Sequence, residues 1–407
     1  MTYRISSEVG KLRQVILHRP GREMDRLTPT NKDELLFDDI LWTSQGQKEH
    51  DVFAQALRDE GAEVLYLDQL LAETLQVQEA REWVSAETFE QRWYGVTGIE
   101  MMREYADSLN AKELAELFIA GMTKAELVEK VGHLPSAYID RSADDFMILR
   151  CLPNHLFTRD TSCWIYNGVS VNSMQKPARQ RETINIQAIY RWHPRFANSD
   201  FSLWSKGLED GPATIEGGDV AVIGNGAVLV GISERTTAAG FERLGQALLA
   251  GSEEITSVTG VLMKEERAQM HLDTVMTMVN EDTFLKYKHL GMLPTITLTR
   301  GAHGNIAAKT NHGEEMHEVL AAALGLKTIN VLTTPEDDFA AERGQWNDAC
   351  NVFTVEPNVV VAYDRNPTAN EYLQSQGIRV IAVPGAELGR GRGGPRCMSC
   401  PTLRDDI

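Results

Sequence analysis

The feature that most constrains the fold of this 407-residue chain is a unit that recurs three times. Each copy runs from an aspartate through an apolar run, a short turn and a second apolar run to an arginine. The turns contain Asn-Gly, Gly-Asn-Gly and Pro-Asn, and turn residues of this kind between alternating apolar runs are typical of β-hairpins. The three copies extend from Asp160 to Arg179, from Asp219 to Arg235 and from Asp348 to Arg365.

Two further segments look like weaker copies of the unit. The segment 271–278 begins with His-x-Asp ahead of an apolar run, and the N-terminal segment holds short strand patterns at 13–18 and 64–67 around a helical stretch at 47–60. Copies about 50 to 75 residues apart predict modules arranged around a pseudo-symmetry axis. We therefore predict an α/β fold, a five-bladed pseudo-symmetric α/β propeller of ββαβ repeats, whose equivalent acids begin equivalent strands and converge on the axis. Taken alone, the repeats are explained equally well by hairpins that happen to be bounded by Asp and Arg.

Between the first and second copies the chain becomes helical. Good helix formers occur throughout 76–131, and apolar residues recur at helical spacing within 111–119. Asn110 is placed to cap that helix, and Thr123 with Glu126 has the form of a capping box. Strand signals are absent for about seventy residues. We therefore predict a first propeller module at 1–74, an inserted α-helical domain at 75–149, and the remaining, catalytic modules at 150–407.

Composition excludes several classes of protein. The formal net charge of −18 opposes binding to nucleic acid and slightly favours a cationic substrate. No run approaches the roughly eighteen apolar residues of a membrane span, and the first residues mix charges with apolar side chains, unlike a signal peptide. Five cysteines, an odd and scattered set, do not form a disulfide framework. We expect a cytoplasmic protein without nucleic-acid or membrane partners.

A glycine-rich stretch at 389–394 precedes Cys397. Glycines allow a positive φ and a close approach of the backbone to a ligand, so the loop is suited to presenting a thiol. Arg392 and Arg396 predict a lowered thiol pKa and hence a reactive thiolate. The alternatives are an ordinary buried cysteine, a dinucleotide fingerprint without its following helix and acid, and a Cys397-x-x-Cys400 redox or zinc pair without supporting residues.

Four motifs taken together resemble those of one enzyme family. They are Phe-Thr-Arg-Asp at 157–160, Glu-Gly-Gly-Asp at 216–219, His-x-Asp at 271–273 and Arg-Cys-Met-Ser at 396–399. In this order and over nearly the whole length, they resemble arginine deiminases, members of the guanidino-modifying α/β-propeller, or pentein, superfamily. The predicted helical insertion resembles the domain that distinguishes arginine deiminases from smaller relatives. Cys400 stands where some members carry Met, which leaves the chemistry in place but puts oxidative stability in doubt.

The resemblance implies hydrolysis of free L-arginine to L-citrulline and ammonia, in arginine catabolism and without metal or cofactor. Cys397 would be the nucleophile that forms a covalent thiouronium, and His271 the general acid and base. A planar, permanently charged guanidinium must be held by carboxylates, and Asp160 and Asp273 fit that role. Glu216 would complete the set. The one-residue spacing of His271 and Asp273 predicts that both lie on one strand face.

The rest of the substrate needs an anion site and an apolar wall. Arg179 and Arg235 match the family's carboxylate binders and have no obvious neutralising partner in the sequence, although structural salt bridges are the alternative. Arg392 would close over the site or compete with the substrate for its carboxylates. Further predicted contacts are Asn154, Phe157 and Leu41. The loop 34–42 is either a lid or an ordinary core cover.

The nearest alternatives keep the fold and change the substrate to agmatine, methylated arginine or protein-bound arginine. A protein-bound substrate requires an open cleft, and agmatine requires no carboxylate-binding arginines. A catalytically inactive binding propeller would lack Cys397, His271 or Glu216, and a papain-like protease would carry its cysteine near the N-terminus. We expect a homo-oligomer that acts on a small molecule.

Overall fold

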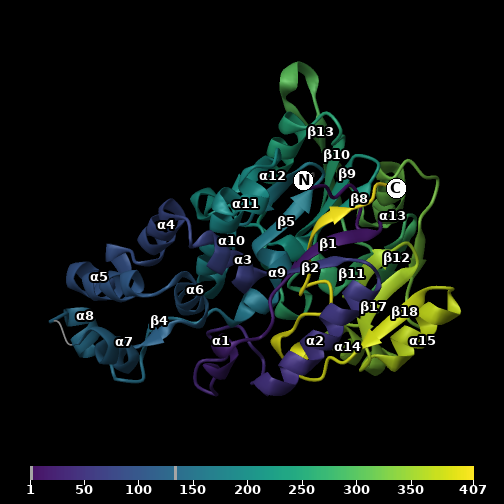
Figure 1. Ribbon diagram of the computed structural model, residues 1–407. Helices are drawn as coiled ribbons and strands as arrows, with labels where there is room; N and C mark the ends of the chain where they lie inside the picture. The colour runs from purple at the N-terminus through teal and green to yellow at the C-terminus, as the bar shows by residue number, and fades with distance from the viewer. Residues whose placement is uncertain (1–2, 133–134) are drawn as a thin grey trace.

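Five separate sheets share one strand pattern in the computed structural model, which describes residues 3–132 and 135–407 (Figure 1). In each sheet a central strand pairs antiparallel with one neighbour and parallel with the other. The sheets, central strand in the middle, are β19 (Cys400–Arg404), β1 (Leu12–Leu17), β2 (Glu63–Tyr66); β5 (Ser162–Ile165), β6 (Gly168–Val171), β7 (Ser202–Lys206); β8 (Val220–Gly224), β9 (Ala227–Ile232), β10 (Ser257–Leu262); β11 (Met276–Asn280), β12 (Thr283–Lys286), β15 (Asn330–Leu332); and β16 (Phe353–Glu356), β17 (Val359–Tyr363), β18 (Arg379–Val383).

A helix lies in the chain between each central strand and its parallel partner, because a parallel pair requires a crossover connection. These helices are α2 (Thr43–Asp59), α10 (Pro177–Trp192), α12 (Ala238–Gly251), α13 (Met316–Ala323) and α15 (Pro367–Ser375). Further helices are α1 (Arg22–Asp25), α9 (Thr158–Thr161), α11 (Pro194–Ala197) and α14 (Asp338–Trp346). The hairpins predicted from the three clear repeats and the ββαβ order are therefore confirmed. The closure of the five sheets into a propeller stays a prediction.

The third sheet is larger than the others. A hairpin of β13 (Thr295–Arg300) and β14 (Ile306–Asn311), which comes from a later part of the chain, extends it to five strands. This hairpin projects from the body at the top of Figure 1.

The first sheet joins the two ends of the chain. β19 pairs antiparallel with β1, so the sheet takes one strand from the C-terminal segment and is not built from 1–74 alone. Figure 1 shows the two termini close together. Because β19 begins at Cys400, this pairing also fixes where the chain segment around Cys397 enters the body of the protein.

The predicted insertion is helical and extends from the body on the left of Figure 1. It contains α4 (Gln78–Thr88), α5 (Gln91–Ser108), α6 (Ala111–Ala120), α7 (Lys124–Val131) and α8 (Ala137–Arg141), while α3 (Leu67–Thr74) contacts α6 and α10. The capping boxes at Asn110 and Thr123 are confirmed. The sequence predicts no strand here, yet β3 (Met122–Thr123) pairs with β4 (Met147–Leu149). A ladder this short leaves no alternating pattern in the sequence.

The sequence predicted that the repeated acids begin strands. In the structure they lie just before the strands instead. Asp160 is in α9, Asp219 and Asp273 are in single 3₁₀ turns, and Asp348 lies shortly before β16. All four are buried. Turns at the strand entrances therefore bring the acidic side chains into the protein interior. Among residues 3–132 and 135–407, no helix combines the length and apolar character that crossing a membrane requires.

Candidate active site

One buried pocket brings together eight of the eleven predicted site residues. Glu216 and Asp273 lie directly behind it, in contact with its lining, whereas Leu41 is not part of the lining. The pocket is lined by Leu36, Asn154, Phe157, Asp160, Arg179, Arg235, Met270, His271, Gly391, Arg392 and Cys397.

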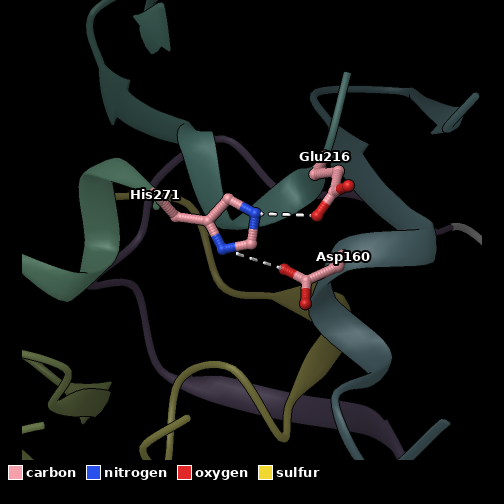
Figure 2. A group of neighbouring side chains, drawn as sticks. All are labelled: Asp160, Glu216 and His271. Atoms are coloured by element: carbon pink, nitrogen blue, oxygen red, sulfur yellow. Dashed lines mark hydrogen bonds and ion pairs between the residues drawn. The ribbon is translucent and has the colours of Figure 1, made fainter. Parts of the chain in front are cut away.

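His271 lies between two carboxylates (Figure 2). Its Nε2 is 2.9 Å from Oε2 of Glu216, and its Nδ1 is 3.7 Å from Oδ1 of Asp160. Burial alone would lower the pKa of His271, but Asp160, Glu216 and the nearby Asp219 raise it to about 9. Despite burial, Arg235 and the contact with His271 hold the pKa of Glu216 well below its usual range. The imidazole is therefore positively charged at neutral pH and can donate a proton.

The prediction that His271 and Asp273 share a strand face is wrong. His271 precedes a 3₁₀ turn, Leu272–Thr274, which contains Asp273. The turn sends the imidazole toward Glu216 and the Asp273 carboxylate toward Cys397. Asp219 stabilises this arrangement, because its Oδ1 accepts a hydrogen bond of 2.9 Å from the Leu272 amide.

The Cys397 thiol faces the carboxylate of Asp273. Its Sγ is 3.8 Å from Oδ1 and 3.7 Å from Oδ2. Burial raises the pKa of Cys397 well above its ordinary value, and Asp273, Asp160 and Asp348 raise it further. The expected lowering by neighbouring arginines is wrong, because Arg396 is paired with Asp273 at 2.7 Å and with Glu8 at 3.1 Å. Without a bound cation the thiol stays protonated.

The glycines before Cys397 act through packing. None of Gly389, Gly391, Gly393 and Gly394 has a positive φ, whereas Arg392 does, at 61°. A Cβ on Gly393 would lie 2.3 Å from the Phe157 ring, and one on Gly394 would lie 2.7 Å from Oδ1 of Asn351. The expectation that these glycines supply positive φ values is therefore wrong. Their missing side chains let the loop pack tightly against the pocket wall.

The two arginines predicted to bind a carboxylate already contact acids. Arg179 begins α10 rather than ending a hairpin, and its guanidinium is 2.6 Å from Oδ2 of Asp160 and 2.9 Å from Oε2 of Glu182. Arg235 is 3.3 Å from Oε2 of Glu216 and 3.1 Å from Oε2 of Glu234. The expectation that neither has a neutralising partner is wrong.

Arg392 is the lining cation without a carboxylate partner. The residue is 4% exposed, and none of its three guanidinium nitrogens has a hydrogen-bond partner among the described residues. Its Cζ lies 3.5 Å from the centroid of the half-exposed Trp346 ring, a cation–π contact. The predicted competition for the site's carboxylates is not seen here. Arg392 is instead held at the pocket with its hydrogen-bonding capacity free.

The segment 34–42 covers the pocket and is anchored at several points. Asn154 donates a 2.7 Å hydrogen bond from Nδ2 to the carbonyl of Leu35, and Arg267 donates to the carbonyl of Leu36 at 3.0 Å. Leu36 lines the pocket where Leu41 was predicted to do so, whereas Leu41 lies in the core behind it. The segment therefore forms part of the wall of the pocket through Leu36.

Comparison with known proteins identifies the family. A model described as arginine deiminase matches residues 33–404 of the chain. The chain belongs to the arginine deiminase family. Its chemistry therefore concerns amidine groups such as guanidinium, as the sequence motifs predicted.

Solved structures of other proteins show the same pentein-type α/β fold. A dimethylarginine dimethylaminohydrolase, an adduct with S-methyl-L-thiocitrulline, is 15% identical with a TM-score of 0.52, over 96% of this chain and 99% of that chain. The same enzyme from Pseudomonas aeruginosa, complexed with citrulline, is 14% identical with a TM-score of 0.52, over 96% of this chain and 99% of that chain. SxtG, an amidinotransferase from Microseira wollei in saxitoxin biosynthesis, is 12% identical with a TM-score of 0.59, over 100% of this chain and 98% of that chain.

Three groups of this arginine deiminase family member have the ligand types of a metal site. Carboxylate and imidazole atoms of Asp160, Glu216 and His271 lie within 4.8 Å of one another. Both carboxylates already contact guanidinium groups, Asp160 that of Arg179 and Glu216 that of Arg235. The absence of a metal or cofactor stays a prediction.

Three residues that shape the site were not predicted. Asn351 and Glu182 are buried and hydrogen-bonded to predicted site residues, and Trp346 stacks on Arg392. Arg396 was predicted only as a charge that lowers the pKa of Cys397, whereas it is hydrogen-bonded to Asp273. Asn351 and Trp346 carry no local pattern that distinguishes them from ordinary polar and aromatic residues.

Proposed function

We propose that this protein hydrolyses free L-arginine to L-citrulline and ammonia through a covalent thiouronium on Cys397. The observation that supports it most is the arrangement of one pocket. The thiol of Cys397, the carboxylate of Asp160 and the charged imidazole of His271 line it, with Asp273 behind the thiol, and the unpaired guanidinium of Arg392 lines the same pocket. A guanidinium and a carboxylate on one small molecule complement these groups.

The enclosure of the pocket favours a free amino acid over a protein-bound arginine. Every charged lining residue is at most 4% exposed, and the segment 34–42 covers the site. A side chain on a folded protein could not reach Cys397 without displacing that cover. Among the substrates that the family chemistry allows, the enclosed pocket therefore favours a small molecule.

The charges explain how the nucleophile would be activated. The carboxylates of Asp273, Asp160 and Asp348 disfavour a thiolate. A guanidinium bound by these carboxylates would place a positive charge beside Cys397, so that the thiol releases its proton to solvent and the thiolate is stabilised by direct attraction. The substrate itself would complete the active form of the enzyme.

The first half-reaction breaks one carbon–nitrogen bond. The thiolate of Cys397 adds to the guanidinium carbon and gives a neutral tetrahedral adduct. Protonated His271 donates its proton to the departing nitrogen, so that ammonia leaves and a positively charged thiouronium remains. Asp160 and Asp273 hold the guanidinium nitrogens, and Glu216 holds the imidazole at 2.9 Å.

The second half-reaction releases the product. His271, now neutral, takes a proton from water, and the resulting hydroxide adds to the thiouronium carbon. The carbon–sulfur bond then breaks as the hydroxyl proton passes to the sulfur of Cys397 and the ureido carbonyl forms. Citrulline departs, Cys397 returns to the thiol, and His271 is protonated again. Incubation with L-arginine, agmatine and dimethylarginine, each followed by ureido and ammonia assays, tests this function directly.

We also propose that the five sheets are blades around an axis through the site. Their common strand pattern supports this, as does the recurrence of a buried aspartate just before the first strand of several sheets. The site residues would then come from equivalent positions in different blades.

Substrate choice gives a first prediction. Arg392→Gln should lower kcat/KM for L-arginine by about 30-fold to several thousand-fold, the effect of 2–5 kcal/mol from truncating one partner of a buried charge pair. Agmatine lacks the carboxylate, so it should react poorly with the wild type and lose far less in the variant. Steady-state kinetics with both substrates measure the ratio.

Arg365→Gln is the matched control, because it makes the same change at an exposed arginine outside the pocket. It should leave the ratio unchanged. A parallel fall for both substrates in Arg392→Gln would mean that Arg392 has a structural role. The carboxylate would then bind Arg179 or Arg235 after displacement of their acidic partners.

A further inference from the structure

We propose that Asn351 is a positioning residue that sets the separation between the Cys397 thiol and the Asp273 carboxylate. This inference rests on the proposed function insofar as it takes Cys397 as the nucleophile. The evidence for it is a pair of hydrogen bonds from one buried carboxamide.

The Asn351 side chain bridges the two segments that carry the reacting groups. Its Oδ1 accepts a hydrogen bond of 3.1 Å from the Cys397 amide, and its Nδ2 donates one of 3.0 Å to the Asp273 carbonyl. The residue is fully buried. Both functional groups of the carboxamide are therefore used, and each contacts the backbone of a predicted catalytic residue.

The surroundings hold this bridge in place. The Asn351 amide donates to the carbonyl of Asp348 at 3.0 Å in the turn before β16. On the other side, a Cβ at Gly394 would lie 2.7–2.8 Å from Asn351 atoms, so a larger residue does not fit. Gly394 thus packs directly against Asn351.

A bridge is needed because Cys397 and Asp273 are distant in the chain and belong to different modules. The charged link between these segments runs from Arg396 to the Asp273 carboxylate, at 2.7 Å. The neutral link through Asn351 joins their backbones instead. Together they hold Sγ at nearly equal distances, 3.8 and 3.7 Å, from the two carboxylate oxygens. A guanidinium held by Asp273 would then meet the sulfur in a defined place.

The use of the Cys397 amide for positioning is consistent with the chemistry. Many enzymes that attack carbonyl groups use backbone amides to stabilise a developing oxyanion. When a thiolate adds to a guanidinium, the two opposite charges cancel and no oxyanion forms in the first adduct. The Cys397 amide is therefore free to serve as an anchor.

Kinetics provide the first test. Asn351→Ala removes both hydrogen bonds and should lower kcat by about 100-fold, the effect of a displacement of roughly 1 Å, with KM changed much less. Thr354→Val is the matched control. Thr354 is also buried, three residues later in the chain, and its hydroxyl donates a 2.6 Å hydrogen bond to the Met278 carbonyl, but it does not touch Cys397. This control should keep a nearly wild-type kcat.

Alkylation of Cys397 by iodoacetamide, followed by peptide mass spectrometry across pH, provides a test that needs no turnover. The titratable and charged groups that face the thiol are Asp273, Asp160 and Asp348, with Arg396 beside it and Arg392 and Tyr363 nearby. In Asn351→Ala the thiol can move away from these carboxylates, so its alkylation should occur at lower pH. Asn351→Asp adds a negative charge and should shift alkylation to higher pH, while Thr354→Val should match the wild type.

The isosteric Asn351→Asp variant keeps the test informative if the alanine variant does not fold. Equal changes in Asn351→Ala and Thr354→Val, or an Asn351→Asp profile identical to wild type, would overturn the inference. If wild type hydrolyses no amidine at all, the proposed function fails, and the alkylation profiles still decide the role of Asn351.

Discussion

Cys397→Ala is expected to abolish amidine hydrolysis and to leave the fold intact. Removing a covalent nucleophile from groups that act as a unit costs on the order of 10⁶-fold in kcat. The chain offers no replacement, because the nearby Cys400 lies on β19 with its Sγ 3.4 Å from the Ser162 carbonyl, on another wall of the core. Ammonia release, followed continuously, measures the loss, and circular dichroism checks the fold.

Cys400→Ser is the matched control for this prediction. Its environment already contains the hydroxyl groups of Ser162 and Tyr190, at 3.6 and 3.9 Å, so a serine is readily accommodated. This variant should retain most activity. Acid quenching of the wild type during turnover should also show a substrate-derived adduct on the peptide that contains Cys397. Activity in Cys397→Ala, or equal losses in both variants, contradicts the assignment.

Local signals explain what could be predicted from the sequence. Hairpins depend on a few turn residues and on alternation over four to six positions, so the strand pairs around Asn167, Asn225 and Asn358 could be recognised directly. Helix caps are equally local, and Asn110 and Thr123 cap as predicted. The two-residue strand β3 was missed because its pairing depends on β4, more than twenty residues later.

The motif residues were also predicted, but their contacts were not. The repeat pattern predicts Arg179 at the end of a hairpin. Pro177, just before it, is however a typical first residue of a helix, and Glu182 stands at i+3 on the same face. Recognising the helix would have revealed the Arg179–Glu182 pair. The contact of Arg179 with Asp160 depends on how α9 and α10 pack, which no local pattern encodes.

The charge state of Cys397 shows the same limit. Arg392 and Arg396 are its neighbours in sequence, which suggested a lowered thiol pKa. In three dimensions Arg396 is neutralised by Glu8 and Asp273, and Arg392 stacks on Trp346. Carboxylates distant in sequence dominate instead, so the pKa is raised. A pKa depends on the spatial arrangement of charges, which the order of residues does not give.

His271→Asn is expected to lower kcat by about two to four orders of magnitude, the usual range for general acid–base catalysis. Asparagine can keep a hydrogen bond to Glu216, but it cannot donate a proton to the departing nitrogen or accept one from water. His271→Ala should lose at least as much, and it also leaves the buried Glu216 without this partner. Pre-steady-state and steady-state rates with saturating substrate measure the effect. The matched control is His50→Gln, because His50 is buried in α2 outside the pocket.

The pH dependence separates a catalytic from a structural histidine. The folded-state pKa of about 9 lies above the ordinary value of 6.5, so protonated His271 stabilises the folded enzyme. This contribution is fully present below about pH 6.5 and is lost as the pH rises through 9. The ratio of wild-type to His271→Asn activity cancels the titration of the substrate's own amine and of Cys397. It should be large below pH 9 and fall above it, because only the wild type loses a proton donor there. A ratio that stays constant across this range would assign His271 a structural role and move the acid–base function to another group.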